Sequence, residues 1–196
     1  MLASDWRNVL PTLTGRSVTL REVASADLRP LVDVLSLGDA TRFGLDRPVS
    51  DLTVQELIDR AARDRAAGRA FTYAIIVNAS RSLVGAAQVR QLDPKFEAAE
   101  WELTIVPSAR GTGVFLEAAR LLGSFTFGVI GTHRLESRVL LQNGRANGAL
   151  RKLGAVQEGI LRRSLKWSGD YFDQVLWSLL KEDWGDQWVS TAARVH

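Results

Sequence analysis

Strand-like and helix-like hydrophobic periodicities alternate along the chain, and their order limits the possible folds more than any single motif does. Strand patterns occupy residues 17–23, 71–77, 82–92, 98–106, 134–141, 155–165 and 171–180. Helical patterns occupy residues 28–38, 53–68, about 112–128 and 144–153. The order β-α-α-β-β-β-α-β-α-β-β predicts a mixed α/β (α+β) fold built on one sheet. Thr53 and Glu56 have the spacing of a capping box at the start of the second helix.

Length and composition place the chain among ordinary globular proteins. Its 196 residues are 46% hydrophobic and 24% charged. We expect one domain over residues 1–184 and a loosely ordered tail over 185–196, with Trp184 and Trp188 as possible anchors. Neither a membrane-spanning run nor a signal peptide is evident, so we expect a cytoplasmic protein without a membrane partner.

The residue types that are missing exclude several kinds of chemistry. The chain has no cysteine, and its two histidines are His133 and His196. Cysteine nucleophiles and multi-histidine metal centres are therefore excluded, and we expect no metal. The net charge is +3, with arginines spread along the chain and no cluster interleaved with aromatic residues. A nucleic-acid partner is accordingly the least favoured interpretation.

The stretch SARGTGVFLEAARLL, residues 108–122, joins a glycine turn to an amphipathic helix. The first amides of a helix lack intrahelical partners, and glycines let phosphate oxygens approach them. Arg110 would add a positive charge at this point. The sequence around the turn fits neither a P-loop nor a dinucleotide-binding fingerprint. An ordinary tight turn is the alternative interpretation.

Several stretches together resemble the GNAT superfamily of acyl-CoA-dependent N-acyltransferases, whose turn has the pattern Arg/Gln-x-x-Gly-x-Gly/Ala. Arg110 and Gly113 match this pattern, whereas Phe115 replaces a small residue. The chain looks most like the branch of ribosomal-protein N-terminal acetyltransferases and their antibiotic-modifying relatives. The resemblance is carried, in order, by LTGRSVTLREV, AEWELTIVPSARGTG, NGRANGALRKLGAVQEGILRR and DYFDQVLWSLLKEDW. It implies a mixed, mostly antiparallel seven-stranded sheet with about four helices, splayed between its fourth and fifth strands.

The same resemblance implies how acetyl-CoA would bind as co-substrate. Backbone groups of Thr104, Ile105 and Val106 would bond the pantetheine arm. The pyrophosphate would lie on the turn formed by Arg110, Gly111, Thr112, Gly113, Val114 and Phe115. Asn143 would bond the cofactor near its thioester, although an Asn-Gly pair is also a common turn.

Two glutamates on the predicted fourth strand are candidates for the catalytic base. Glu100 and Glu102 are two residues apart and would share a face of the strand. Mutual repulsion would raise the pKa of at least one carboxyl group, which suits a base. The alternative is that both are surface carboxylates or partners of nearby arginines. Leu150 stands where many members of the superfamily have an acidic tyrosine, and Ala146 where this branch often has serine, so water or another hydroxyl would protonate the thiolate.

The acceptor is expected to be a primary amine of a protein N-terminus or of a small molecule such as an amino-sugar antibiotic. Its binding pocket would be lined by aromatic side chains, for which the candidates are Phe43, Tyr73, Trp101, Trp167 and Tyr171. Core positions are the alternative for each aromatic residue. A catalytically impaired acyl-CoA sensor or scaffold is the second functional interpretation, because the acid residues are missing. A homodimer is expected from the resemblance only.

Overall fold

The computed structural model describes residues 5–36, 48–167 and 169–185. Its strands are β1 (Leu13–Thr14), β2 (Val18–Glu22), β3 (Ala70–Val77), β4 (Leu83–Gln91), β5 (Ala98–Ile105), β6 (Arg134–Leu140), β7 (Val156–Trp167) and β8 (Asp170–Leu180). Its α-helices are α1 (Leu28–Leu35), α2 (Asp51–Ala66), α3 (Val114–Phe125) and α4 (Gly144–Lys152).

The described residues form one eight-stranded sheet in the order β1-β2-β3-β4-β5-β6-β8-β7. Only β5 and β6 pair in parallel; the other neighbouring strands are antiparallel. The predicted mixed, mostly antiparallel sheet with four helices is therefore confirmed.

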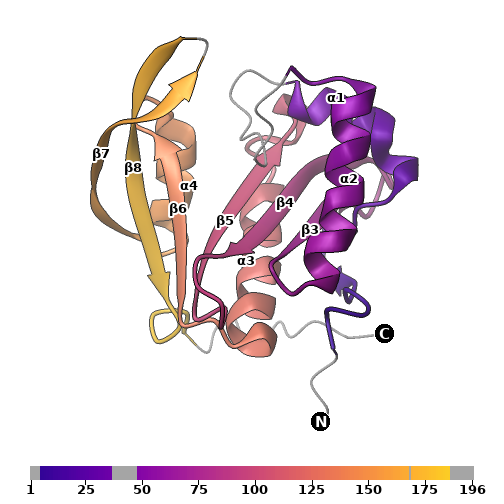
Figure 1. Ribbon diagram of the computed structural model, residues 1–196, viewed down its shortest axis with the longest axis horizontal. Helices are drawn as coiled ribbons and strands as arrows, with labels where there is room; N and C mark the ends of the chain where they lie inside the picture. Colours follow the sequence, from indigo (N-terminus) through magenta and orange to yellow (C-terminus); the bar gives the residue numbers. More distant parts are fainter. Residues whose placement is uncertain (1–4, 37–47, 168, 186–196) are drawn as a thin grey trace.

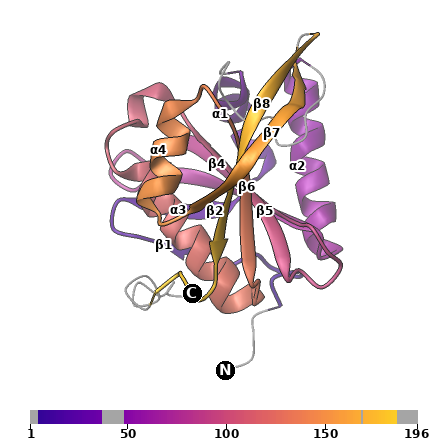
Figure 2. The ribbon, with the colours of Figure 1, turned by 90° about the vertical axis from the view of Figure 1, so that its left-hand side faces the viewer.

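The helices lie on both faces of the sheet. Figure 2 shows α2 on one side of the strands and α3 with α4 on the other. Apolar residues of α1 and α2 pack on Ala74 and Ala86, while those of α3 and α4 pack on the opposite face around Tyr73 and Trp101. In Figure 1, α1 and α2 lie over β3 and β4, whereas β6, β7 and β8 extend beyond them.

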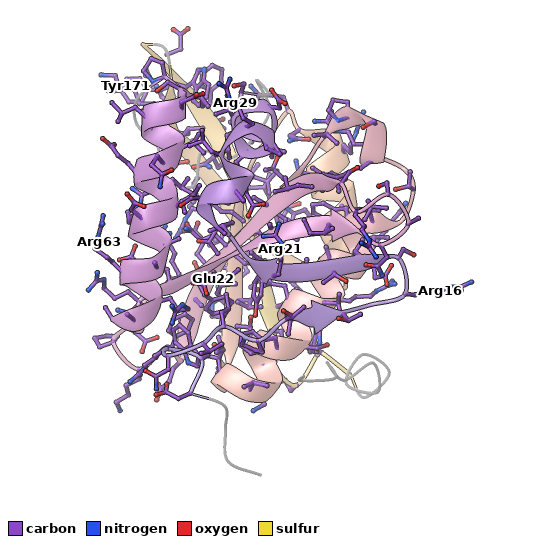
Figure 3. The ribbon with its side chains drawn as sticks, turned by 90° about the vertical axis from the view of Figure 1, so that its right-hand side faces the viewer. Arg16, Arg21, Glu22, Arg29, Arg63 and Tyr171 are labelled. Carbon is purple, nitrogen blue, oxygen red and sulfur yellow. The ribbon has the colours of Figure 1, made fainter. Side chains whose placement is uncertain are left out.

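Ion pairs hold the first two helices against β2. Asp27, directly before α1, bonds Arg21 at 2.7 Å, and Glu22 bonds Arg65 of α2 at 2.6 Å. Burial alone would raise the pKa of Asp27, but the bonds from Arg21 and from the Ala24 amide outweigh it and lower that pKa. In Figure 3, Arg21 and Glu22 lie on β2, beside the helices.

Three local details differ from the sequence prediction. The eighth strand is the two-residue β1, which is too short to show any periodicity. The cap of α2 is Ser50, whose hydroxyl accepts from the Thr53 amide, so the box lies three residues before the predicted one. The third helix ends in a π-helical turn over Thr126–Ile130.

Contacts at both ends fix the position of α3. Near its start, Glu117 accepts a 3.0 Å hydrogen bond from the Ser17 amide in the turn between β1 and β2. Near its end, the ring of Trp184 lies against Gly123, where a Cβ atom would come within 2.6 Å of it. Trp184 thus packs on α3, whereas Trp188 lies outside the described residues, and the predicted anchoring of the tail stays a prediction.

Candidate active site

β5 and β6 lie side by side over three rungs and then part. Their parallel register begins with Ala98 opposite Arg134 and ends with Glu100 opposite Glu136. Farther along the chain, β5 pairs with β4 and β6 pairs with β8 to their ends. We call the last shared rung the fork; Figure 1 shows the strands diverging from it. The sequence did not predict β1, so the predicted fourth and fifth strands are β5 and β6. The divergence at the fork is therefore the predicted splay.

Beyond the fork, β5 has one paired edge and one open edge. The Val106 amide donates to the Val84 carbonyl at 2.8 Å. Backbone groups of successive residues point to opposite edges, so Thr104 bonds to β4 while Leu103 and Ile105 face the side of β6. In the described chain the outward-facing groups have no strand partner. Three residues were expected to bond pantetheine. Of these, Ile105 lies on the open edge, whereas the backbone groups of Thr104 and Val106 face β4. Leu103 also lies on the open edge.

The glycine turn before α3 has the backbone that its sequence requires. Gly111 and Gly113 have φ angles of 77° and 89°, which favour glycine, and Gly113 is the N-cap of α3. A Cβ atom built on either glycine meets nothing within 4 Å. The Thr112 hydroxyl donates to the Ala109 carbonyl at 2.7 Å, which closes the turn. The turn therefore has open space beside both glycines, directly before the first amides of α3.

The side chains of the first two residues of α3 point toward the core. Val114 is buried, and Phe115 is half-buried and packs on the same apolar cluster. Phe115 therefore replaces the small residue of the family pattern without covering the glycines. Val114 and Phe115 can therefore bind an anion through their backbone amides but not through their side chains.

The two glutamates of β5 share a face but differ in their surroundings. The register places Glu100 opposite Arg90 and Glu102 opposite Gln88 on β4. Glu100 is 4% exposed, and its oxygens bond Arg90 and, at 2.7 Å, Arg138 of β6. It is thus a partner of arginines, one of the two alternatives left open by the sequence. Glu102 is less buried than Glu100.

Further ion pairs continue from Arg138 across the same face of the sheet. Arg138 bonds Glu136 at 3.2 Å, and Arg134 bonds Glu136 at 2.9 Å and Glu158 of β7 at 2.6 Å. Bonds from Arg134 and the Ser178 hydroxyl lower the pKa of Glu158 to about 2. Bonds to Glu158 and Glu136 raise the pKa of Arg134. We call this group the ion-pair chain; its members are Arg90, Glu100, Arg138, Glu136, Arg134 and Glu158.

Two asparagines connect α4 to the end of β6. Asn143 is the N-cap of α4, and its side-chain oxygen accepts from the Ala146 amide at 3.1 Å. This contact is the turn role that the sequence left open, and a bond to the cofactor stays a prediction. Asn147 is buried, donates to the Leu140 carbonyl at 3.0 Å and accepts from Trp177 Nε1 at 2.8 Å.

Two of the predicted acceptor-binding aromatics are core residues. Tyr73 is 0% exposed and Trp101 is 1% exposed, and both belong to the cluster around α3. The Tyr73 hydroxyl donates to the Pro11 carbonyl at 2.9 Å, and burial raises the pKa of this hydroxyl. Neither side chain lines a surface pocket, so the acceptor assignment of both is corrected. Their odd-numbered positions direct them to the α3 face of the sheet.

The other predicted acceptor-binding aromatics lie elsewhere. Trp167 is half-buried at the end of β7. Tyr171 is 50% exposed near the tip of the β7–β8 hairpin, where Arg163 and Lys166 approach its ring to 5.2 and 5.6 Å. Phe43 lies outside the described residues.

The sequence reasoning missed the arginines at the fork. Arg90 and Arg138 come from strands on either side of β5. One signal was available, because Arg134, Glu136 and Arg138 alternate along one strand and so share a face. Their partner Glu100 is 38 residues away from Arg138 in the sequence, and only the strand order brings them together.

Among residues 5–36, 48–167 and 169–185, no group of three or more metal-ligating side chains occurs. Within the same residues, no helix is long and apolar enough to cross a membrane.

Comparison with known proteins identifies the family. The model of the acetyltransferase (GNAT) domain matches residues 17–156, which include β2 to α4 and therefore the fork and the glycine turn. The chain belongs to the GNAT acetyltransferase family. Its named relatives are N-acetyltransferases, and this is its enzyme class.

Individual relatives of this GNAT domain cover most of its length. YoaA of Bacillus subtilis, an uncharacterized N-acetyltransferase, is 25% identical over 174 residues, covering 88% of this chain and 98% of its own. Spermidine N(1)-acetyltransferase of Escherichia coli is 24% identical over 159 residues, 81% and 83% of the two chains. Mycobacterium smegmatis RimJ, in complex with CoA-disulfide, superposes with a TM-score of 0.77 at 20% identity, covering 92% and 90%. The structural likeness shows a shared fold.

Proposed function

We propose that this GNAT domain transfers an acetyl group from acetyl-CoA to a primary amine of a protein N-terminus or a small molecule. One observation carries the proposal: the open edge of β5 leads directly into the glycine turn. β5 ends at Ile105 and α3 begins at Val114, so unpaired strand groups and unpaired helix amides follow each other along the chain. An extended pantetheine arm that ends in a pyrophosphate matches this succession of donors. The CoA-disulfide complex of RimJ, which has the same fold, supports the ligand class.

The N-terminus of α3 would hold the pyrophosphate. Gly111 and Gly113 leave space above the first amides of the helix, and Arg110 stands at the same turn. The positive end of the helix dipole adds to the attraction for an anion. The side chains of Val114 and Phe115 stay in the core, so their amides do not move away from this position.

Glu102 is the better candidate for the base. The oxygens of Glu100 accept from two guanidinium groups and the side chain is almost fully buried, so an amine cannot readily approach it. Glu102 lies on the same face, two residues farther from the fork. It would take the amine proton directly or through water as nitrogen attacks the thioester carbon. Leu103 or Ile105 would supply a backbone amide to the developing oxyanion.

The thiolate that leaves when the carbon–sulfur bond breaks needs a proton. Leu150, at the position of the family tyrosine, is buried in the core. Ala146 has no titratable group, and Asn147 is fully engaged in structural hydrogen bonds. We therefore assign this proton to water.

Calorimetry with acetyl-CoA tests the proposal, and two glycines provide a matched pair of variants. Gly113 and Gly131 both have a φ of 89°, and a Cβ atom on either meets nothing within 4 Å. Gly113→Ala and Gly131→Ala should each lose about 1 kcal/mol of stability, because alanine is strained at such a φ. Only Gly113→Ala should weaken acetyl-CoA binding. Absence of binding by the unmodified chain would contradict the proposal.

A second candidate function is an acyl-CoA sensor without turnover. Two observations favour it: Glu100 is held by arginines, and Leu150 replaces the usual acid. The sensor would bind acetyl-CoA in the same calorimetric experiment but would release no thiol with any amine. Thiol release with one member of an amine panel decides for the enzyme.

A further inference from the structure

The fork is held by a side-chain contact where its backbone contacts end. The last rung joins Glu100 to Glu136, and Arg138 lies two residues farther along β6, about 7 Å beyond that rung. Its guanidinium reaches back to β5 and bonds Glu100 at 2.7 Å. Arg138 thus joins the two strands after they have begun to diverge.

The partner of Arg138 is itself fixed. Glu100 is 4% exposed, and Arg90 of β4 bonds its other oxygen. A buried carboxylate that loses one partner keeps its desolvation cost. Breaking either ion pair of Glu100, with Arg90 or with Arg138, is therefore unfavourable. One carboxylate therefore ties β4, β5 and β6 together at the fork.

Arg138 is also held from the side of β6. Glu136 bonds Arg138 at 3.2 Å and Arg134 at 2.9 Å, and Arg134 bonds Glu158 of β7 at 2.6 Å. The guanidinium is thus held by two carboxylates and has little freedom to turn. Arg138 thus bridges β5 and β6 just beyond the fork, with its guanidinium held from both strands.

We propose that Arg138 is a positioning residue that sets the separation of β5 and β6 and thereby the place of the open edge of β5. The inference rests on the proposed function, since the open edge would hold the pantetheine and the thioester. Arg138 acts through Glu100 and β5 and needs no contact with the substrate. The glycine turn belongs to α3, whose start is fixed by its own contacts, and should not depend on Arg138.

The test compares two ligands on each variant. Acetyl-CoA uses both the open edge and the glycine turn, whereas 3′-phospho-ADP, measured as a competitor, has no pantetheine and uses the turn alone. Arg138→Met should weaken acetyl-CoA binding about tenfold and leave the competitor unchanged. Arg65→Met is the control, because it breaks a comparable 2.6 Å ion pair with Glu22, away from the fork, and should change neither ligand.

Other outcomes decide against the inference. Unchanged acetyl-CoA binding by a folded Arg138→Met variant, or an equal loss of both ligands, would overturn it. If Arg138→Met does not fold, Arg138→Lys decides: one ammonium cannot reproduce the two-sided bridge, so acetyl-CoA alone should bind more weakly. An Arg138→Lys variant that binds acetyl-CoA like the unmodified chain would overturn the inference. Failure of the unmodified chain to bind acetyl-CoA is a different result and contradicts the proposed function itself.

Discussion

At the scale of single residues, the two glutamates of β5 show how surroundings divide roles between identical side chains. Glu100 is buried between two arginines, and Glu102 lies two residues farther along the open part of the strand. The sequence placed both on one face, which the register confirms. It did not show that the charge of Glu100 is offset by Arg90 and Arg138, because these residues belong to neighbouring strands.

The division of roles predicts different effects for two isosteric substitutions. Glu102→Gln should lower kcat by about 100-fold with little change in the KM for acetyl-CoA, because only proton removal is lost. Glu100→Gln should lower the unfolding temperature, because it leaves two arginines without their anion. Steady-state kinetics and thermal unfolding measure both effects, with the exposed Glu97→Gln as control. Full turnover by Glu102→Gln would remove it as the base.

Asn147 allows a residue-scale prediction about stability. Its amide donates to the Leu140 and Asn143 carbonyls and accepts from Trp177 Nε1. Asn147→Ala should lower the free energy of unfolding by about 3 kcal/mol, because it leaves these buried polar groups without partners. Gln142→Ala, at an exposed neighbouring position, should have almost no effect in the same denaturant titration. Equal stability of the two variants would contradict this role.

At the scale of elements, the long periodic segments were predictable and the short or aperiodic ones were not. The strand patterns at 71–77 and 98–106 correspond to β3 and β5 within one residue, because an apolar run rich in β-branched and aromatic residues marks the first and polar–apolar alternation marks the second. β1 has two residues, and the π-helical turn after α3 has no periodicity of its own. The splay at the fork was predicted from family resemblance rather than from local pattern.

Close packing between β4 and β5 predicts the effect of a glycine substitution. A Cβ atom on Gly85 would lie 2.3 Å from the Thr104 carbonyl oxygen and 2.8 Å from the Ile105 side chain. Gly85→Ala should therefore displace the end of β5, lower stability by about 2 kcal/mol and weaken acetyl-CoA binding. Gly159→Ala is the matched strand control, since its Cβ meets nothing within 4 Å. Thermal unfolding and calorimetry separate the two; a harmless Gly85→Ala would contradict the close approach.

At the scale of the whole molecule, the ion-pair chain links β4 to β7 across the face of the sheet on which α1 and α2 also pack. Its middle members lie at the fork, and its last member, Glu158, lies on the edge strand β7. Long-range arrangement of this kind depends on strand order, so residues distant in the sequence become neighbours. This is why the sequence yielded the glycine turn, a local feature, but not the arginines around Glu100.

The same dependence on tertiary structure explains the aromatic residues. A tyrosine or tryptophan on a strand can lie either in the core or on a binding surface. Its exposure depends on whether a helix covers that face of the sheet. α3 covers the face that carries Tyr73 and Trp101, so both are core residues. Tyr171 lies on a hairpin near its tip, away from that cover, and is exposed.

The lowered pKa of Glu158 predicts a pH dependence of stability. The pKa is about 2 in the folded chain against 4.5 ordinarily, so the stabilisation is complete above about pH 4.5 and is lost as the pH falls toward 2. Glu158→Gln should therefore unfold at a lower temperature than the unmodified chain at pH 7, and the difference should vanish near pH 2. Glu182→Gln, at an exposed position, should show no such difference. A gap that is independent of pH would contradict the assignment.

The central claim is that the fork and the glycine turn together carry acetyl transfer to a primary amine. Its most direct measurement is thiol release from acetyl-CoA by the purified chain, over a panel of N-terminal peptides, polyamines and amino sugars. Mass spectrometry of each amine accompanies the thiol assay. We predict that at least one amine gains an acetyl group with equal release of thiol, and that Gly113→Ala slows this reaction more than Gly131→Ala does. Binding of acetyl-CoA without acetylation of any amine in the panel would contradict the claim.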